Sequence, residues 1–163
     1  MWHAISSLLK AISIRRSQRK ENSRRKNLGH ARSGITIVAV LRTVSDRTLL
    51  DELSRRNQWN LCYVPSSDEA HAALQRNKPQ IILVDRDVVA PDWRFAVSSL
   101  STASGGACVL LISTVIDDYL WNEVITNGGY DVVRKPLIEE DVLRNVKLAW
   151  AYWYGTRRTA ARK

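Results

Sequence analysis

Five short apolar runs, rich in β-branched residues, recur along the chain and are separated by stretches long enough for a helix. The apolar residues in these runs are nearly continuous, which is typical of strands buried on both faces of a parallel sheet. The runs cover residues 35–41, 59–64, 80–84, 107–112 and 130–134. We therefore predict five strands of one parallel sheet.

The stretches between these runs carry apolar residues at helical spacing and begin with residues that often start helices. Predicted helices begin at Ser45, at Ser66 or Ser67, at Pro91-Asp92, at Asp117-Asp118 and near Glu139, and the last one runs to about Tyr154. Gly105-Gly106 and Gly128-Gly129 are expected to end two of them. Alternating strands and helices predict an α/β fold with three layers, in which helices cover both faces of a doubly wound sheet.

A length of 163 residues and a hydrophobic content of 45% suit one globular domain. The net charge of +9 is unevenly distributed along the chain. Residues 1–34 carry +8 and residues 155–163 carry +4, which leaves −3 for residues 35–154. We predict a folded domain at 35–154 between two basic tails, and any binding to nucleic acid has to rest on the tails.

The N-terminal tail, residues 1–34, combines an apolar pattern with a run of basic residues. Hydrophobic residues recur at helical spacing at Trp2, Ile5, Leu8, Leu9 and Ile12, and the basic segment 15–26 follows. An amphipathic helix beside a polybasic segment is typical of binding to membrane surfaces, and the same charges suit nucleic-acid phosphates. The alternatives are a disordered, solvated extension or a start codon assigned too far upstream.

Cys62 and Cys108 each lie inside an apolar run, as expected for buried free thiols in a reducing compartment. The chain has no Cys-x-x-Cys pair and its three histidines are scattered, so no metal site is predicted from these residues. No apolar stretch approaches the roughly 20 residues of a transmembrane helix. The apolar N-terminal residues precede the basic ones, the reverse of a signal peptide, so we predict a cytoplasmic protein.

Two residues of opposite charge stand at the ends of predicted strands. Asp85 ends the third apolar run, and Lys135 follows the fifth. Binding sites of open α/β sheets lie outside the carboxyl ends of the strands. We therefore expect Asp85 and Lys135 to meet in one small polar pocket, with Asp87 close by.

Three segments at these strand ends resemble the receiver domains of two-component response regulators. Pro79–Asp85 resembles the segment with the phosphoacceptor aspartate, Leu111–Ser113 the one with a phosphoryl-contacting Ser or Thr, and Asp131–Leu137 the one with the invariant lysine and its proline. The resemblance covers residues 35–154. It implies a flavodoxin-like sheet of strand order 2-1-3-4-5, with Asp85 as phosphoacceptor position and Ser113, Lys135 and Pro136 in the pocket. It also implies a cis Lys135-Pro136 bond.

Two departures from the family pattern change the expected chemistry. The family's acid pair for Mg²⁺ at the end of strand one is replaced by Leu41 and Arg42, which cannot ligate a hard cation. Asp46 is a poor substitute, and Asp87 would be one acid replacing two. We expect weak or absent Mg²⁺ binding and no cofactor. Val132 stands where the family usually has a Tyr or Phe that turns inward on phosphorylation.

Arg42 has two interpretations. Its guanidinium could stand near Asp85 where Mg²⁺ normally sits, with Lys135 as a second cation, and hold the domain in one state. Alternatively, Arg42 points to solvent, and Asp85 is satisfied by Lys135 and water.

The chain carries no recognisable enzyme motif. Residues 29–36 have the spacing of a phosphate-binding loop, but Ile35 replaces the lysine and the segment precedes the first strand. We therefore predict a protein that is not an enzyme.

The last predicted helix has more apolar surface than one buried face requires. Trp150, Trp153 and Tyr154 on this helix, with Trp121 on the helix before it, are candidates for a protein interface. The alternative is a C-terminal tail that folds back over the aromatic residues.

We predict a stand-alone atypical receiver in phosphorelay signalling that acts by protein contact, with phosphorylation of Asp85 weak or lost. A histidine kinase or a second copy of the chain is the expected partner. One alternative is a conventional phosphorylated receiver. Another is a scaffold whose basic tails bind a membrane surface or nucleic acid.

Overall fold

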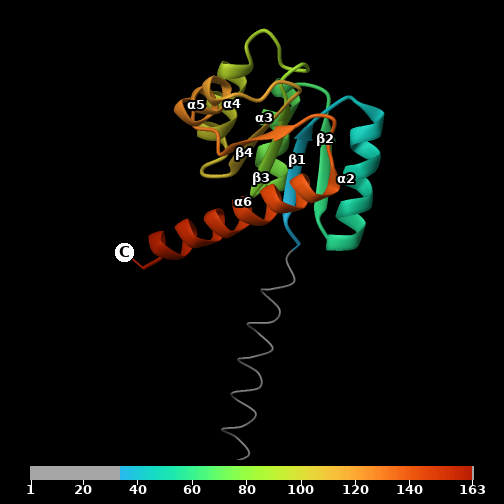
Figure 1. Cartoon of the computed structure of the whole chain (residues 1–163). Helices are drawn as coiled ribbons and strands as arrows, with labels where there is room; N and C mark the ends of the chain where they lie inside the picture. Colours follow the sequence, from blue (N-terminus) through green and yellow to red (C-terminus); the bar gives the residue numbers. More distant parts are fainter. Residues whose placement is uncertain (1–33, 163) are drawn as a thin grey trace, which may run out of the picture. The chain divides into compact units, whose positions relative to one another are not determined.

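The computed structural model describes residues 34–162, which form one sheet with helices on both faces (Figure 1). The elements, in chain order, are β1 (Thr36–Val40), α2 (Val44–Asn57), β2 (Asn60–Val64), α3 (Ser67–Asn77), β3 (Ile81–Asp85), α4 (Trp93–Ala103), β4 (Cys108–Ser113), α5 (Asp118–Thr126), β5 (Asp131–Arg134) and α6 (Glu139–Ala160). The five strands are parallel and lie in the order β2-β1-β3-β4-β5. The predicted fold class and strand order are confirmed.

Successive side chains of each strand point to opposite faces of the sheet and build two hydrophobic cores. On one face, Val38 and Val40 of β1 pack with residues of α3, α4 and α5. On the other face, Ile37, Ala39 and Leu41 pack with residues of α2 and α6. The central strands β1, β3 and β4 are buried from both sides, which explains their nearly continuous apolar sequence, whereas the edge strand β2 is only partly buried.

The predicted helix boundaries have identifiable causes. The Ser66 hydroxyl accepts the Glu69 N–H at 3.2 Å, and the Asp117 carboxylate accepts the Leu120 N–H at 2.7 Å, so both residues cap the helices that follow. Gly128 adopts a φ of 83° just after α5, a conformation that glycine accommodates without a side-chain clash. These starts and this end agree with the sequence predictions.

The end of the last helix was predicted wrongly. Instead of stopping at Tyr154, α6 continues to Ala160, so most of the predicted tail 155–163 is helical and projects beyond the sheet (Figure 1). Arg157 donates to the Gly105 carbonyl at 3.0 Å and lies over the Trp153 ring, while Arg158 lies over the Tyr154 ring. These contacts, and the favourable position of cations at a helix C-terminus, extend the helix.

Cys62 and Cys108 are free thiols, as predicted, but only Cys108 is buried, and burial raises the pKa of its thiol to about 11. Within residues 34–162, no helix is long and apolar enough to cross a membrane. The proposed amphipathic helix and the basic segment 15–26 lie outside the described residues.

Candidate functional site

Asp85 is the last residue of β3, and its side chain is almost completely buried at the carboxyl edge of the sheet. One carboxylate oxygen accepts a hydrogen bond from the Lys135 ammonium at 2.5 Å. The other accepts the backbone N–H of Asp87 at 3.0 Å. Each oxygen of the carboxylate therefore has a protein donor, and the predicted meeting of Asp85 with Lys135 is confirmed.

Lys135 reaches Asp85 from the loop that follows β5. Its backbone N–H donates to the Ser113 carbonyl at 2.9 Å, which continues the β4–β5 pairing beyond the last strand residue. Its side chain is 14% exposed, and its ammonium also lies 4.0 Å from the Asp87 carboxylate. The bond from Lys135 to Pro136 is cis, as the resemblance implied, and Pro136 itself is exposed.

Ser113 is buried at the same edge, at the end of β4, but its hydroxyl does not bond to Asp85. It donates to the Val115 carbonyl at 2.8 Å and accepts the Val115 N–H at 3.3 Å. The hydroxyl thus closes the turn after β4. The structure brings Ser113 to the predicted edge without giving it a contact in the Asp85–Lys135 pair.

Arg42 does not pair with Asp85, so the first of its two interpretations is wrong. Arg42 is exposed and donates to the Pro65 carbonyl at 3.2 Å. The reason is local: the preceding side chain, Leu41, is fully buried in the core, and Arg42 turns outward. The cation that holds Asp85 is Lys135 alone among the residues that the structure describes.

The site residues do not fit the Mg²⁺ ion that the fold family implies. Mg²⁺ requires hard oxygen ligands in an octahedral arrangement. Here Leu41 contributes a buried apolar side chain, the Asp85 carboxylate is held by an ammonium, and the Asp87 side chain is 68% exposed. No three His, Cys, Asp or Glu side chains gather within residues 34–162 as a metal site would need.

Asp46 lies in the first turn of α2, as expected, but its burial was not predicted from the sequence. It is only 2% exposed. One oxygen accepts the Leu137 N–H at 3.1 Å, and the other has no hydrogen-bond partner among the described residues. A sequence signal existed: Asp46 precedes Leu50 by four residues and Leu53 by seven, so all three share the inward face of the helix.

Arg47, the next residue, fixes the end of β1. Its guanidinium donates twice to the Leu41 carbonyl, at 2.9 and 2.5 Å, and lies over the Tyr63 ring. The Tyr63 hydroxyl donates to the Asp51 carboxylate, and burial together with this bond raises the pKa of Tyr63. The Arg47 guanidinium is therefore bound to a backbone carbonyl and packed against Tyr63, and it has no contact with Asp85 among the described residues.

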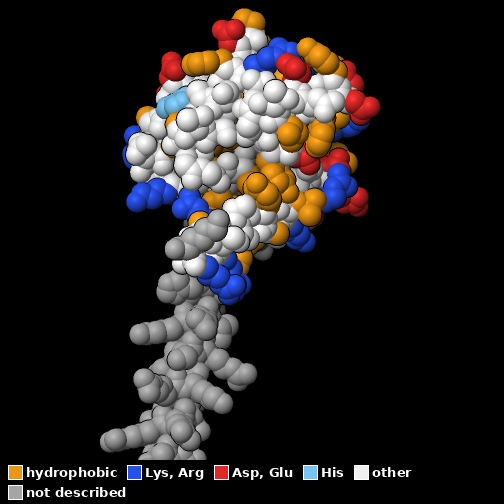
Figure 2. Space-filling view, turned by 90° about the vertical axis from the view of Figure 1, so that its left-hand side faces the viewer, with side chains coloured by type: hydrophobic (Ala, Val, Ile, Leu, Met, Phe, Trp, Pro, Cys, Tyr) orange, Lys and Arg blue, Asp and Glu red, His pale blue; other side chains and the backbone are white. Residues whose placement is uncertain are grey.

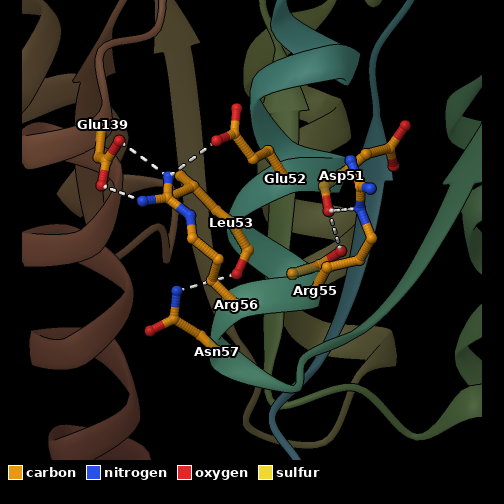
Figure 3. Close-up of polar contacts among 8 residues, drawn as sticks. Asp51, Glu52, Leu53, Arg55, Arg56, Asn57 and Glu139 are labelled. Carbon is orange, nitrogen blue, oxygen red and sulfur yellow. Dashed lines mark hydrogen bonds and ion pairs between the residues drawn. The ribbon is translucent and has the colours of Figure 1, made fainter.

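A polar link joins α2 to the start of α6. The Arg56 guanidinium donates to both oxygens of Glu139, at 3.0 and 2.9 Å, and also lies 3.7 Å from Glu52 (Figure 3). The hydrogen bond from Arg56 lowers the pKa of Glu139. Together with the bond between Asp46 and Leu137, this link connects α2 to the chain that follows Lys135.

The four candidate interface residues differ in exposure. Trp150 and Trp153 stack on each other, with centroids 5.3 Å apart, and pack against the core, so they are mainly structural. Trp121 and Tyr154 are 45% and 50% exposed. The backbone of residues 155–160 continues as helix and does not fold back, although the Arg157 and Arg158 side chains lie over the Trp153 and Tyr154 rings. The sequence analysis missed Tyr152, which is exposed and packs on Tyr130. Figure 2 shows hydrophobic side chains reaching the surface in groups among the charged ones.

Comparison with known proteins rests on structure alone. No protein-family model matches the sequence, and no curated protein does. The chemotaxis response regulator CheY4 of Vibrio cholerae superposes with a TM-score of 0.64 at 16% identity, over 72% of this chain and 99% of that one. NtrX of Brucella abortus gives 0.70 at 17% identity, over 80% of this chain and 30% of NtrX.

The receiver domain of the sensor histidine kinase PA1611 from Pseudomonas aeruginosa gives a TM-score of 0.61 at 16% identity, over 76% of this chain and 99% of that domain. The chain has the fold of a response regulator receiver domain. The same strand order and the clustering of Asp85 with Lys135 agree with the resemblance found in the sequence.

Proposed function

We propose that this chain is an atypical receiver domain of phosphorelay signalling that acts through protein contact, with phosphorylation of Asp85 weak or lost. One observation carries the proposal. The Asp85 carboxylate is held by Lys135 and a backbone amide, while Leu41 and Arg42 stand at the positions where the resemblance expects metal-binding acids. The scaffold of a receiver is present without the ligands for its metal.

Phosphoryl transfer depends on positive charge beside the oxygens of the transferred group, and Mg²⁺ supplies most of it. The structure of the PA1611 receiver domain holds a magnesium ion in its active site cleft. In the present chain the lysine is the cation that contacts Asp85, and a buried Val132 replaces the aromatic switch residue. Both differences favour a domain that keeps one conformation.

A receiver domain that does not change conformation on phosphorylation can act only through the partners that its surface binds. The exposed side chains of Trp121 and Tyr154 on α5 and α6 offer apolar area for a protein partner, for which we propose a histidine kinase or a second copy. On this proposal the chain is not an enzyme, needs no cofactor and works in the cytoplasm.

The test is chemical phosphorylation of the full chain with acetyl phosphate, with and without Mg²⁺, followed by intact-mass analysis. We expect little adduct in either condition. A conventional receiver such as CheY4, treated in parallel, serves as the positive control, and Asp85→Asn reports labelling at other sites. Rapid, stoichiometric labelling that needs Mg²⁺ and disappears in Asp85→Asn would overturn the proposal.

A conventional phosphorylated receiver is the second candidate, and the retained pairing of Asp85 with Lys135 favours it. The two candidates differ in one measurable property, the dependence of Asp85 labelling on Mg²⁺. The same acetyl phosphate experiment therefore separates them.

A further inference from the structure

Asp46 connects α2 to the loop that carries Lys135. Its carboxylate accepts the Leu137 N–H at 3.1 Å, across 91 positions of sequence. Leu137 lies two residues after Lys135, so the bonded amide and the pocket lysine belong to the same short segment. The bond therefore ties the position of this segment to the first turn of α2.

The burial of Asp46 needs an explanation, because an ionisable group in a protein interior is costly unless it is well paired. Asp46 is 2% exposed, and one of its oxygens has no partner among the described residues. Leu50 and Leu53 on the same helix face are apolar and fully buried. An apolar residue at position 46 would match this environment better. The helix N-terminus offsets only part of the cost.

We propose that Asp46 is a positioning residue for Lys135: by accepting the Leu137 N–H, it fixes residues 135–137 and so keeps the lysine ammonium on Asp85. This deepens the proposed function and rests on it, because it names what holds that pocket in one state. On this proposal, Lys135 holds the Asp85 carboxylate, Asp46 holds the segment that carries Lys135, and Arg42 contributes to neither contact.

Two other contacts hold this segment or the chain directly after it, and they limit the expected effect. The Lys135 N–H donates to the Ser113 carbonyl, and Glu139 is bound by Arg56. Loss of the Asp46 bond should therefore loosen the segment without releasing it. Lys135 would leave Asp85 more often, while the fold remains intact.

The test is competitive labelling of lysine amines in the full chain with acetic anhydride, read by peptide mass spectrometry. Lys78 and Lys147 are exposed and serve as internal references. Asp46→Leu removes the acceptor while filling the space, and Asp46→Asn keeps an amide oxygen in its place. We expect labelling of Lys135, relative to the references, to rise about fivefold in Asp46→Leu, as for the loss of one hydrogen bond of ordinary net strength. In Asp46→Asn it should stay near the wild-type value.

Unchanged Lys135 labelling in Asp46→Leu overturns the proposal, and so does an equal rise in Asp46→Asn, since the acceptor would then not be the cause. If Asp46→Leu does not fold, hydrogen exchange decides. The Leu137 amide must exchange slowly in both wild type and Asp46→Asn, and fast exchange in either is contrary to the proposal. Neither lysine labelling nor hydrogen exchange depends on phosphorylation. A negative result for Asp46 can therefore be told apart from a negative result for the proposed function, which acetyl phosphate labelling tests.

Discussion

The Lys135 ammonium lies 2.5 Å from the Asp85 carboxylate, and the two side chains are 14% and 2% exposed. The pair is therefore largely removed from water. In such a pair, each charge compensates the cost of burying the other. Removal of one partner leaves the second charge buried without compensation.

We accordingly expect Lys135→Met to lower the free energy of unfolding at neutral pH by about 3 kcal/mol. The double variant Lys135→Met with Asp85→Asn should recover most of that loss, because neither charge remains. Urea unfolding followed by circular dichroism measures both. If the single and double variants lose the same stability, Asp85 is not left as an uncompensated buried charge in the single variant, and the description of the pocket is wrong.

Arg42 and Arg47 make a matched pair of cations near the end of β1. Arg42 is exposed and has one hydrogen bond, whereas Arg47 is partly buried and donates twice to the Leu41 carbonyl. Arg42→Met should change the free energy of unfolding by less than about 0.5 kcal/mol. Arg47→Met should cost about 1–2 kcal/mol. The reverse ranking would contradict the contacts described for the two arginines.

The link between Arg56 and Glu139 makes stability depend on pH. Arg56 lowers the pKa of Glu139 below its ordinary value, so the folded state favours the ionised carboxylate. The stabilisation is present above the unfolded pKa of about 4.3 and is lost as the pH falls through the folded pKa. Arg56→Gln should therefore reduce stability at pH ~7 more than at pH ~3. Thermal melts at the two pH values test this, with Arg55→Gln as the control, and equal losses at both would contradict it.

Sequence patterns predicted the parts of this structure that depend on burial and on local signals. The five strands are largely apolar runs, and Ser66, Asp117 and Gly128 mark helix boundaries by their own chemistry. The meeting of Asp85 with Lys135 was predictable because parallel strands end at one edge.

The errors lie where contacts between distant residues decide the outcome. Arg42 turns outward because its neighbour Leu41 fills the core, and the position beside Asp85 is taken by Lys135, which lies 93 residues away in the sequence. The extension of α6 depends on Arg157 reaching Gly105. The role of Asp46 depends on a bond across 91 positions. No periodicity or spacing within one element encodes these contacts.

Restoring the missing acids should restore the metal-dependent chemistry. Leu41→Asp with Arg42→Asp places two carboxylates at the end of β1, beside the edge that carries Asp85, and supplies the hard oxygen ligands that Mg²⁺ requires. We expect the double variant to bind Mg²⁺, which should raise its unfolding temperature. With acetyl phosphate it should form an adduct at Asp85 only when Mg²⁺ is present.

The matched control is Leu41→Asn with Arg42→Asn, which has nearly the same shape without the charges. Leu41 is fully buried, so both double variants should be less stable than wild type, and the Asp variant more so without Mg²⁺ because buried carboxylates cost more than buried amides. The comparison is therefore the change that Mg²⁺ causes within each variant, measured by thermal melts and intact-mass analysis. If the two behave alike, the loss of the acid pair is not what limits phosphorylation. The cause would then lie in the hold that Lys135 and the Asp87 amide keep on the Asp85 carboxylate.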